Sequence, residues 1–279
     1  MLPITMSGLR AAQKELGVTS NNLANASTVG FKRSDANFVD MFPNDPSANP
    51  RTSVGSGTAV DLVSRDTSQG AMKSTGRITD LAIAGRGYFV LKSPQPEDGS
   101  APATFFTRAG GFNVDSSGRM LDSSGNRVQG FEVTDEGVST ELSDLTIPPK
   151  VPSVKADDTP TESMLQTISI SPKGYVQATY SDNSQRNIGY IALANFSNDM
   201  ALRPVGNTDF ALTGESGEPV ITQAGSPQAG DIMSGTLEQA NVDITQELMT
   251  MLRAQQVYNG NARMLQTEVE IASRIVDKL

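Results

Sequence analysis

The C-terminal stretch QELMTMLRAQQVYNGNARMLQTEVEIASRIVDKL (residues 246–279) has the most regular pattern of the chain. Its steps alternate between three and four residues, with only Gln255 polar, at Leu248, Met251, Gln255, Tyr258, Ala262, Leu265, Val269, Ala272, Val276 and Leu279. This spacing predicts a long helix that packs along another helix. We expect Asp243 to be its N-cap, because Gln246 follows three residues later and Glu247 lies in the first turn.

A second heptad pattern lies at the other end of the chain, in MLPITMSGLRAAQKELGVTSNNLANA (residues 1–26). A leucine recurs every seven residues, at Leu2, Leu9, Leu16 and Leu23, and short side chains occupy the complementary positions Thr5, Ala12, Thr19 and Ala26. This N-terminal pattern alone also fits an ordinary amphipathic helix on a globular core. Together they predict terminal helices that pair with each other or with those of other copies.

The composition excludes much catalytic chemistry. The 279 residues include no Cys, no His and no Trp. Ser-His-Asp and Cys-His nucleophile pairs, the usual zinc sites, iron–sulfur clusters and disulfides are therefore impossible. With 22 Lys+Arg against 31 Asp+Glu, the net charge is -9, which argues against a nucleic-acid surface.

The remaining motifs do not form a catalytic site. Gly85-Arg86-Gly87 lacks the third glycine and the helix of a dinucleotide-binding loop, and Tyr88-Phe89-Val90 continues as a strand. We therefore interpret it as a tight turn or bulge. The carboxylates are scattered, and no pair has the setting of an acid and a base. The sequence predicts no enzyme activity, no catalytic residue, no cofactor and no metal.

The sequence predicts neither a membrane-spanning segment nor a cleaved secretory signal. No apolar run approaches the roughly 18–20 residues of a membrane span, so we expect no direct membrane insertion. The first 17 residues lack both the apolar core and the cleavage site of a secretory signal. The protein is expected either to stay in the cytoplasm or to leave by a route that cleaves no signal.

The middle of the chain has the pattern of short β-strands. Apolar or alternating runs occur at 81–92, 103–110, 165–171, 174–181 and 187–196. The near-identical DSSG turns at 115–118 and 122–125 predict hairpins, with glycine at positive φ and aspartate bonding its own turn; a calcium loop is the less favoured interpretation. An antiparallel sandwich or barrel is expected.

The predicted fold class is α+β, with terminal helices in a coiled-coil-like inner domain and a central antiparallel all-β domain. Residues 1–34 and 236–279 form the first, and residues 70–235 form the second. Residues 35–69, rich in Pro, Gly and Ser from 43 to 60, are expected to be an irregular connector. Residues 147–163 are a possible linker or insertion.

Four blocks resemble a known family, that of the bacterial flagellar hook and basal-body rod proteins. SNNLANASTVGFKRSDANF (20–38) resembles the signature that closes the N-terminal helix in that family. SQGAMKSTGRITDLAIAGRGYFVL (68–91), FTRAGGFNVDSSGRMLDSSGNRVQGF (106–131) and SGTLEQANVDITQELMTMLRAQQVYNGNARMLQTEVEI (234–271) are similar to its later blocks, in the same order. The resemblance covers about half of the chain and both termini.

The resemblance implies a structural subunit that assembles with copies of itself into an axial filament. The terminal helices would form an inner tube around a narrow export channel, and the β domain would lie outside it. Expected partners are further copies and adjacent rod, hook and junction subunits. Export would use the flagellar type III apparatus, which cleaves no signal.

The position in the flagellum has two interpretations. The length fits a rod subunit, which would be periplasmic. The segments 187–219 and 235–248 look closer to hook proteins, and they favour a compact hook subunit outside the cell. A different class, a non-flagellar β-domain binding module with coiled-coil ends, would share the heptads and the strands.

Seventeen residues are the candidate self-assembly residues. Asn21, Asn22 and Asn25 can bond freed carbonyls or a neighbouring helix, with ordinary helix termination as the alternative. Gly30 is expected at C′ with Phe31 as its hydrophobic anchor, and Leu237, Val242 and Leu248 are expected to dock the start of the C-terminal helix. The full set is Leu2, Leu9, Leu16, Leu23, Asn21, Asn22, Asn25, Gly30, Phe31, Leu237, Val242, Leu248, Met251, Tyr258, Leu265, Val269 and Val276.

Overall fold

The computed structural model describes residues 2–42, 55–95, 101–134, 137–154 and 160–276. The chain divides into two compact units. The first comprises residues 1–27, 32–68 and 241–279, and the second comprises 28–31 and 69–240. Long terminal helices and a large antiparallel sheet confirm the predicted α+β fold class.

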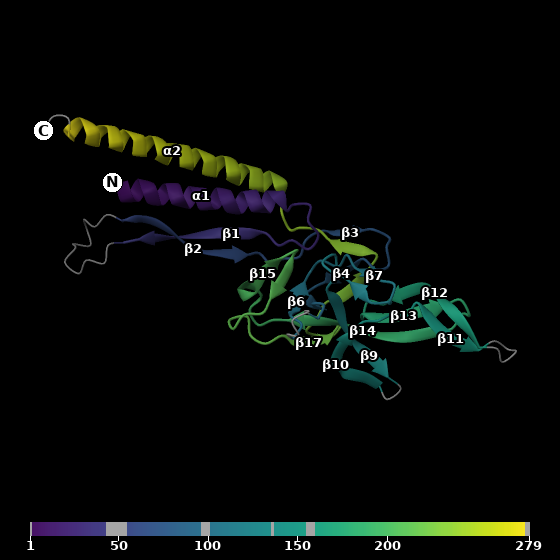
Figure 1. The fold of residues 1–279 in the computed structure, drawn as a ribbon. Helices are drawn as coiled ribbons and strands as arrows, with labels where there is room; N and C mark the ends of the chain where they lie inside the picture. Colours follow the sequence, from purple (N-terminus) through teal and green to yellow (C-terminus); the bar gives the residue numbers. More distant parts are fainter. Residues whose placement is uncertain (1, 43–54, 96–100, 135–136, 155–159, 277–279) are drawn as a thin grey trace. The chain divides into compact units, whose positions relative to one another are not determined.

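The first unit consists of two helices and one hairpin. Its elements are α1 (Leu2–Ala24), β1 (Ser34–Met41), β2 (Gly57–Arg65) and α2 (Ile244–Val276). Within this unit α1 lies between α2 and the β1–β2 hairpin, as Figure 1 shows. The pairing of the two terminal helices with each other is therefore present within a single chain.

The β1–β2 hairpin corrects the prediction of an irregular connector over residues 35–69. The two strands pair antiparallel from Ser34↔Arg65 to Met41↔Gly57. Their β-branched and aromatic residues favour extended backbone, although charged residues interrupt the alternation that marks a strand. The turn-rich composition that suggested a connector is centred on residues 43–54, which lie outside the described residues.

The regular secondary structure described in the second unit is antiparallel sheet, apart from one short 3-10 helix. Its largest sheet has 13 strands, and two further pairs are β18–β4 and β19–β3. The strands are β3 (Met72–Ser74), β4 (Leu81–Ala84), β5 (Tyr88–Lys92), β6 (Thr104–Thr107), β7 (Asn113–Val114), β8 (Met120–Leu121), β9 (Arg127–Thr134), β10 (Gly137–Asp144), β11 (Lys150–Val154), β12 (Pro160–Ile170), β13 (Tyr175–Tyr180), β14 (Gln185–Asn195), β15 (Arg203–Gly206), β16 (Asp209–Ala211), β17 (Val220–Gln223), β18 (Asp231–Ser234) and β19 (Thr236–Glu238), with a short 3-10 helix at Asp199–Ala201.

The core of this unit lies on both faces of the sheet. Along β5, Phe89 and Leu91 belong to one buried cluster, whereas Tyr88 and Val90 belong to another. Successive side chains of a strand point to opposite faces, so a strand covered on both sides is apolar throughout. Residues 191–194 of β14 alternate between the same two clusters. The runs predicted from the sequence as strands correspond to β4 with β5, β6, β12, β13 and β14.

Local turn chemistry behaves as the sequence predicts. Asp115 Oδ1 accepts hydrogen bonds from the backbone N–H groups of Ser117 and Arg119, and Asp122 repeats this arrangement one turn later. Gly118 has a φ of +83°, which glycine adopts without strain. Gly85-Arg86-Gly87 is confirmed as a turn, because it joins β4 to β5.

Two expected boundaries shift. Within the possible linker 147–163, Lys150–Val154 and the start of β12 form a strand pair, and residues 155–159 lie outside the described residues. β19 pairs with β3, so residues 236–240 belong to the second unit rather than to the helical one. The physical reason is that Thr236 and Glu238 are buried in the β-rich unit before the chain reaches α2.

Candidate assembly surface

The two helices of the first unit meet along a narrow, polar contact, which we call the helix seam. Its buried members are Thr5, Ala12, Thr19 and Asn22 on α1 and Glu247 and Ala254 on α2. The Thr5 hydroxyl lies 3.1 Å from Glu268 Oε2, and Asn22 Nδ2 lies 3.3 Å from Glu247 Oε2. These contacts pair the start of α1 with the end of α2, so the helices are antiparallel.

Small residues allow the helices to approach closely. A Cβ added at Gly8 would lie 2.9 Å from Asn261 Nδ2 on the opposite helix. Ala12 is 2% exposed and Ala254 is 0% exposed. The helix seam is therefore formed by short side chains rather than by the large apolar side chains of a typical core.

The position of the helix seam on α2 matches the prediction at some steps, such as the half-buried Ala262, and differs from it at others. The half-buried residues Met251, Tyr258 and Leu265 lie where the spacing places them. Their expected neighbours Leu248, Val269 and Val276 are instead exposed. The places in between are taken by residues one position earlier, such as Glu247 and Ala254. The assignment of Leu248, Val269 and Val276 to the helix seam is therefore wrong, while their role in contacts between copies stays a prediction.

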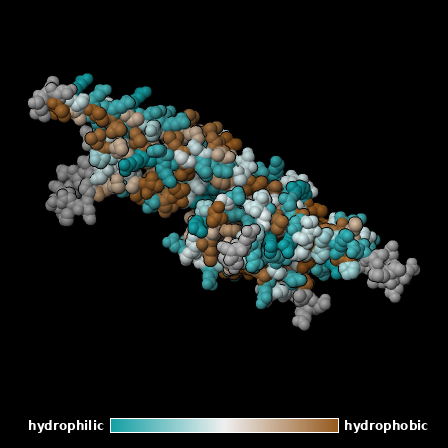
Figure 2. Space-filling model, viewed as in Figure 1, coloured by the Kyte–Doolittle hydropathy of each residue, from teal (hydrophilic) through white to brown (hydrophobic). Residues whose placement is uncertain are grey.

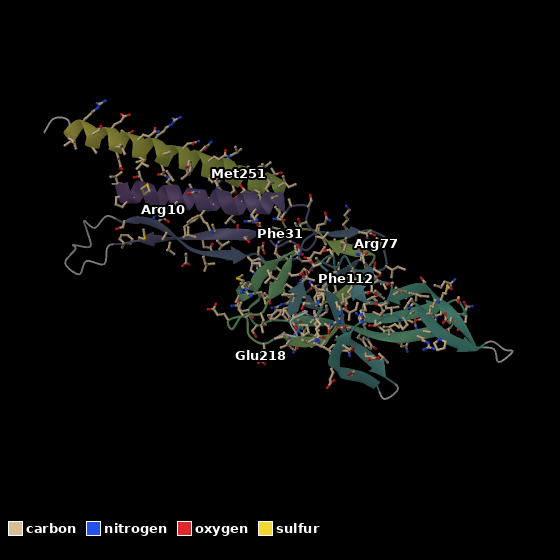
Figure 3. The ribbon with its side chains drawn as sticks, in the orientation of Figure 1. Arg10, Phe31, Arg77, Phe112, Glu218 and Met251 are labelled. Carbon is tan, nitrogen blue, oxygen red and sulfur yellow. The ribbon has the colours of Figure 1, made fainter. Side chains whose placement is uncertain are left out.

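On α1 the heptad positions other than Leu2 face the seam as predicted, but the short residues are more deeply buried than the leucines. The short residues are buried most deeply, and Leu9, Leu16 and Leu23 are half-buried. Leu2 is 47% exposed, so it does not lie in the seam. Figure 3 shows the side chains between the two helices, with Met251 labelled on α2.

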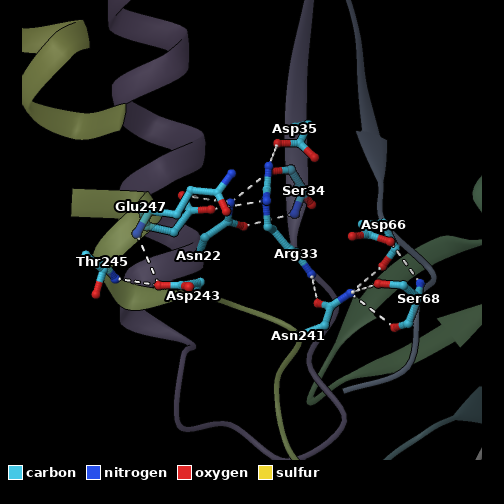
Figure 4. Close-up of polar contacts among 11 residues, drawn as sticks. Asn22, Arg33, Ser34, Asp35, Asp66, Ser68, Asn241, Asp243, Thr245 and Glu247 are labelled. Carbon is cyan, nitrogen blue, oxygen red and sulfur yellow. Dashed lines mark hydrogen bonds and ion pairs between the residues drawn. The ribbon is translucent and has the colours of Figure 1, made fainter. Parts of the chain in front are cut away.

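A polar network joins the end of α1 to the start of β1 and of α2, as Figure 4 shows. Asn22 Nδ2 donates to the Ser34 carbonyl at 2.8 Å, and Asn22 Oδ1 accepts from Ser34 N at 3.0 Å. The buried Glu247 carboxylate accepts from Asn22 and lies 3.1 Å from Arg33 Nε. Arg33 also pairs with Asp35. The burial of Glu247 is thus offset by a cation and an amide.

Asn241 extends this network to the end of β2. Its Oδ1 accepts from Arg33 N at 2.7 Å, and its Nδ2 donates to the carbonyls of Asp66 and Ser68. Asp243 Oδ1 accepts from the backbone N–H groups of Thr245 and Gln246, which confirms the predicted N-cap of α2. Thr245 and Gln246 thereby gain partners for donors that a helix start leaves open.

Of the asparagines at the end of α1, one terminates the helix and one bonds to the neighbouring helix, as the two predicted roles require. Asn25 Nδ2 donates to the Asn21 carbonyl at 3.0 Å, which is helix termination, and Asn22 reaches α2 through Glu247. Asn21 is exposed. No sequence pattern marks Arg33 or Asn241 as members of this network, and Glu247 is expected only in the first turn of the helix; all three lie within the blocks that carry the resemblance.

Three of the expected site residues belong to the second unit, and a fourth, Val242, belongs to the first. α1 ends at Ala24, so Gly30 is not its C′ residue; instead Gly30 N donates to the Glu238 carbonyl within the second unit. Phe31 is half-buried in the second unit as well. Leu237 lies on β19 opposite Lys73, and Val242 is half-buried just before α2. Leu237 therefore belongs to the second unit, and its role in docking the helix start stays a prediction.

Two negative findings apply to the described residues. Within 2–42, 55–95, 101–134, 137–154 and 160–276, no group of three or more Asp and Glu side chains could hold a metal ion. No described helix has the length and apolar character needed to cross a membrane.

One carboxyl group in the second unit is buried beside another. Asp209, 5% exposed, shares the Asn126 amide with Asp122, whose Oδ2 lies 3.0 Å from Asn126 Nδ2. Burial, and next the charge of Asp122, raise the pKa of Asp209 to about 6. The ionised form is thus disfavoured in the folded unit.

Asp209→Asn is therefore expected to stabilise the second unit at pH 7–8, by about 1–2 kcal/mol. The pKa of Asp209 is higher in the folded unit than in the unfolded chain. Its contribution to stability is therefore fully present below the pKa of the unfolded chain and is lost as the pH rises through 6. The gain of the variant should accordingly shrink between pH 7 and pH 4. Thermal unfolding across this range measures it. Asp115→Asn is the matched control, because the Ser117 hydroxyl lowers the pKa of Asp115; a stabilised control or a pH-independent gain would contradict the assignment.

Three sequence families match the chain. They are described as flagella basal body rod protein (residues 2–32), flagellar hook protein FlgE/F/G D1 domain (82–178) and flagellar basal body rod FlgEFG protein C-terminal (233–277). The first and third contain the two helices of the seam, and the second lies in the β-rich unit.

Whole-length relatives agree with these matches. The flagellar basal-body rod protein FlgG of Agrobacterium fabrum is 30% identical over 99% of this chain and 98% of its own. The FlgG protein of Caulobacter vibrioides is 32% identical over 94% and 92%. The flagellar hook protein FlgE of Borreliella burgdorferi is 23% identical over 97% of each chain. Among solved structures, Helicobacter pylori hook protein FlgE2 has a TM-score of 0.24 and 13% identity, covering 74% of this chain and 43% of its own.

The resemblance is thereby confirmed by full-length relatives, and with it the prediction of a structural protein rather than an enzyme. The buried residues of the helix seam all fall within the matched regions, and so does part of the β-rich unit. The chain belongs to the family of bacterial flagellar hook and basal-body rod proteins.

Proposed function

We propose that this chain is a subunit of the flagellar basal-body rod, assembling with copies of itself through its terminal helices. The observation that best supports self-assembly is the exposed apolar surface of α2. Ten large hydrophobic side chains of α2 are at least 44% exposed: Ile244, Leu248, Met249, Leu252, Val257, Met264, Val269, Ile271, Ile275 and Val276. Monomeric proteins rarely leave so large an apolar surface uncovered.

The rod is favoured over the hook by length. The FlgG relatives align over 273–290 residues, close to the 279 of this chain. The FlgE relative aligns over 438 residues, so its match includes long stretches that this chain lacks. Hook remains the second candidate, because that relative spans the whole chain and because 187–219 and 235–248 resemble hook sequences.

The remaining features of the proposal follow from the family. As a rod subunit the chain would be exported by the flagellar type III apparatus and would contact adjacent axial subunits in the periplasm. Copies related by a rotation that does not close give an open helical filament, since each contact joins two different surfaces. The seam helices would then form the inner tube around the channel.

The test is electron microscopy of basal bodies isolated from a strain that lacks this gene. We expect a truncated or missing rod, restored when the gene is supplied on a plasmid. A complete rod without a hook would make the chain a hook subunit. A complete rod carrying a complete hook would contradict both assignments.

A further inference from the structure

A groove runs along α1 on the side that faces the hairpin. Two hollows of about 560 and 700 Å³ share Arg10, and we call them together the α1 groove. The first is lined by Arg10, Gln13, Lys14, Gly17, Val18, Asn21, Ser34 and Val63, and the second by Pro3, Met6, Ser7, Arg10, Ala11, Met41, Ser56, Thr58, Ala59 and Val60.

The α1 groove is basic. Arg10 and Lys14 are its charged lining residues, and no acidic residue lines it. Across the described residues, no ion pair or side-chain hydrogen bond engages either of them. The groove is also open at Gly17, where an added Cβ would have no atom within 4 Å. Glycine weakens a helix interior, and nothing described within the chain requires it at this position.

The hairpin carries the complementary chemistry. The register of β1 and β2 shifts between Asn37 and Phe38, which pair with Leu62 and Val60, so Asp61 is the unpaired residue of a β-bulge. A bulge re-aims the side chain of its extra residue. Asp61 is exposed, and Leu62 beside it is 48% exposed. The bulge thus presents a carboxylate next to an apolar side chain.

The hairpin is also open along its length. β1 and β2 form a two-stranded sheet, so each strand leaves one edge unpaired in this unit. Figure 2 shows apolar side chains gathered on the surface of the helices and of the hairpin. Exposed apolar edges are surfaces that proteins usually cover with another chain.

We propose that the bulge of β2, with Asp61 and Leu62, docks into the α1 groove of a second copy, where Asp61 pairs with Arg10 and Lys14. This rests on the proposed function, since it names the partner surfaces of self-assembly. The bulge carries an acidic and an apolar side chain, and the groove carries basic and apolar side chains, so the two surfaces are complementary. Asp61 and Leu62 are not among the lining residues of the α1 groove, so the contact joins two different sets of residues and can repeat without closing.

The experiment is a charge exchange in the purified full-length chain. Lys14→Asp and Asp61→Lys each place like charges together, so each is expected to raise the protein concentration needed for polymer formation at least about tenfold. The double variant restores the pair between positions 14 and 61 with reversed sign while Arg10 stays cationic, so it is expected to polymerise at a concentration at least about threefold below that of either single variant. Sedimentation and negative-stain microscopy measure the polymer, and circular dichroism verifies the helices.

Two exposed residues of the second unit provide matched controls, Lys73→Glu and Glu218→Lys, for which we expect no change. Gly17→Leu is an independent variant. Leucine favours the helix and has open space in the isolated chain, but it fills the α1 groove, so polymer should be lost while the helices become more stable.

The outcomes separate the two levels of the proposal. If the unchanged chain forms no polymer at any concentration, self-assembly of this chain fails, and the docking fails with it. If it polymerises and the single exchanges do so equally well, the α1 groove has another occupant and the docking is overturned, while the assembly stands. Single exchanges that fail and are not rescued by the double variant overturn the Asp61 pairing.

Discussion

A chain with aspartate in place of Ala254 is expected to lose self-assembly while its β-rich unit unfolds at an unchanged temperature. Ala254 is 0% exposed and lies in the middle of the helix seam. Glu247 is satisfied by Arg33 and Asn22, whereas a carboxylate at this fully buried position would lose its hydration. Leaving a charge buried and unpaired costs about 3–5 kcal/mol.

The neighbouring residue supplies the control. Gln255 is exposed, although the sequence spacing places it in the seam. Gln255→Asp introduces the same charge one residue away, and it should assemble as the unchanged chain does. Polymer formation by sedimentation, together with calorimetry of the β-rich unit, measures both variants. Normal assembly of Ala254→Asp, or loss of assembly in Gln255→Asp alone, would contradict the observed register.

The seam shows what a heptad pattern can and cannot specify. Alternating steps of three and four predicted two long helices and their pairing, because the period of the pattern is a property of each helix alone. The choice between Leu248 and Glu247 depends on the partner. Glu247 is buried because Asn22 and Arg33 satisfy its carboxylate. Hydrophobicity alone therefore selects the wrong residue at that step.

The turns could be predicted from the sequence and the polar network could not, because the turns depend on local contacts and the network on long-range ones. The turns at Asp115 and Asp122 were predictable, because each aspartate bonds backbone within four residues of itself. Asn22 and Glu247 are 225 residues apart in the sequence, and Arg33 and Asn241 are 208 apart. A single sequence contains no signal for such pairs, although it placed Asn22 at a helix end. The hairpin was missed for a related reason, since charged residues interrupt the alternation of its strands and the two strands pair across a long, turn-rich segment.

A buried ion pair holds together several segments of the β-rich unit. Arg108 Nη1 lies 3.3 Å from Glu238 Oε2, and the two side chains are 6% and 0% exposed. Arg108 Nη2 also donates to the Gly85 carbonyl at 2.8 Å, and Glu238 Oε1 accepts from Gly70 N at 2.9 Å. The Gly30 N–H donates to the Glu238 carbonyl. The pair therefore joins the segments that lead into and out of this unit.

Arg108→Met is expected to destabilise the β-rich unit by about 3–5 kcal/mol, because it leaves the Glu238 carboxylate buried without its cation. This corresponds to a fall of roughly 10 °C in the unfolding temperature of a unit of this size. Glu238→Gln keeps an oxygen for Gly70 N and removes the charge, so the double variant should be more stable than Arg108→Met alone. Calorimetry of the four chains closes the double-mutant cycle, and hydrogen exchange at Gly30 and Gly70 reports whether the two segments stay attached. Additive losses in the cycle would mean that Arg108 and Glu238 act independently, and the ion pair would then not be what holds these segments.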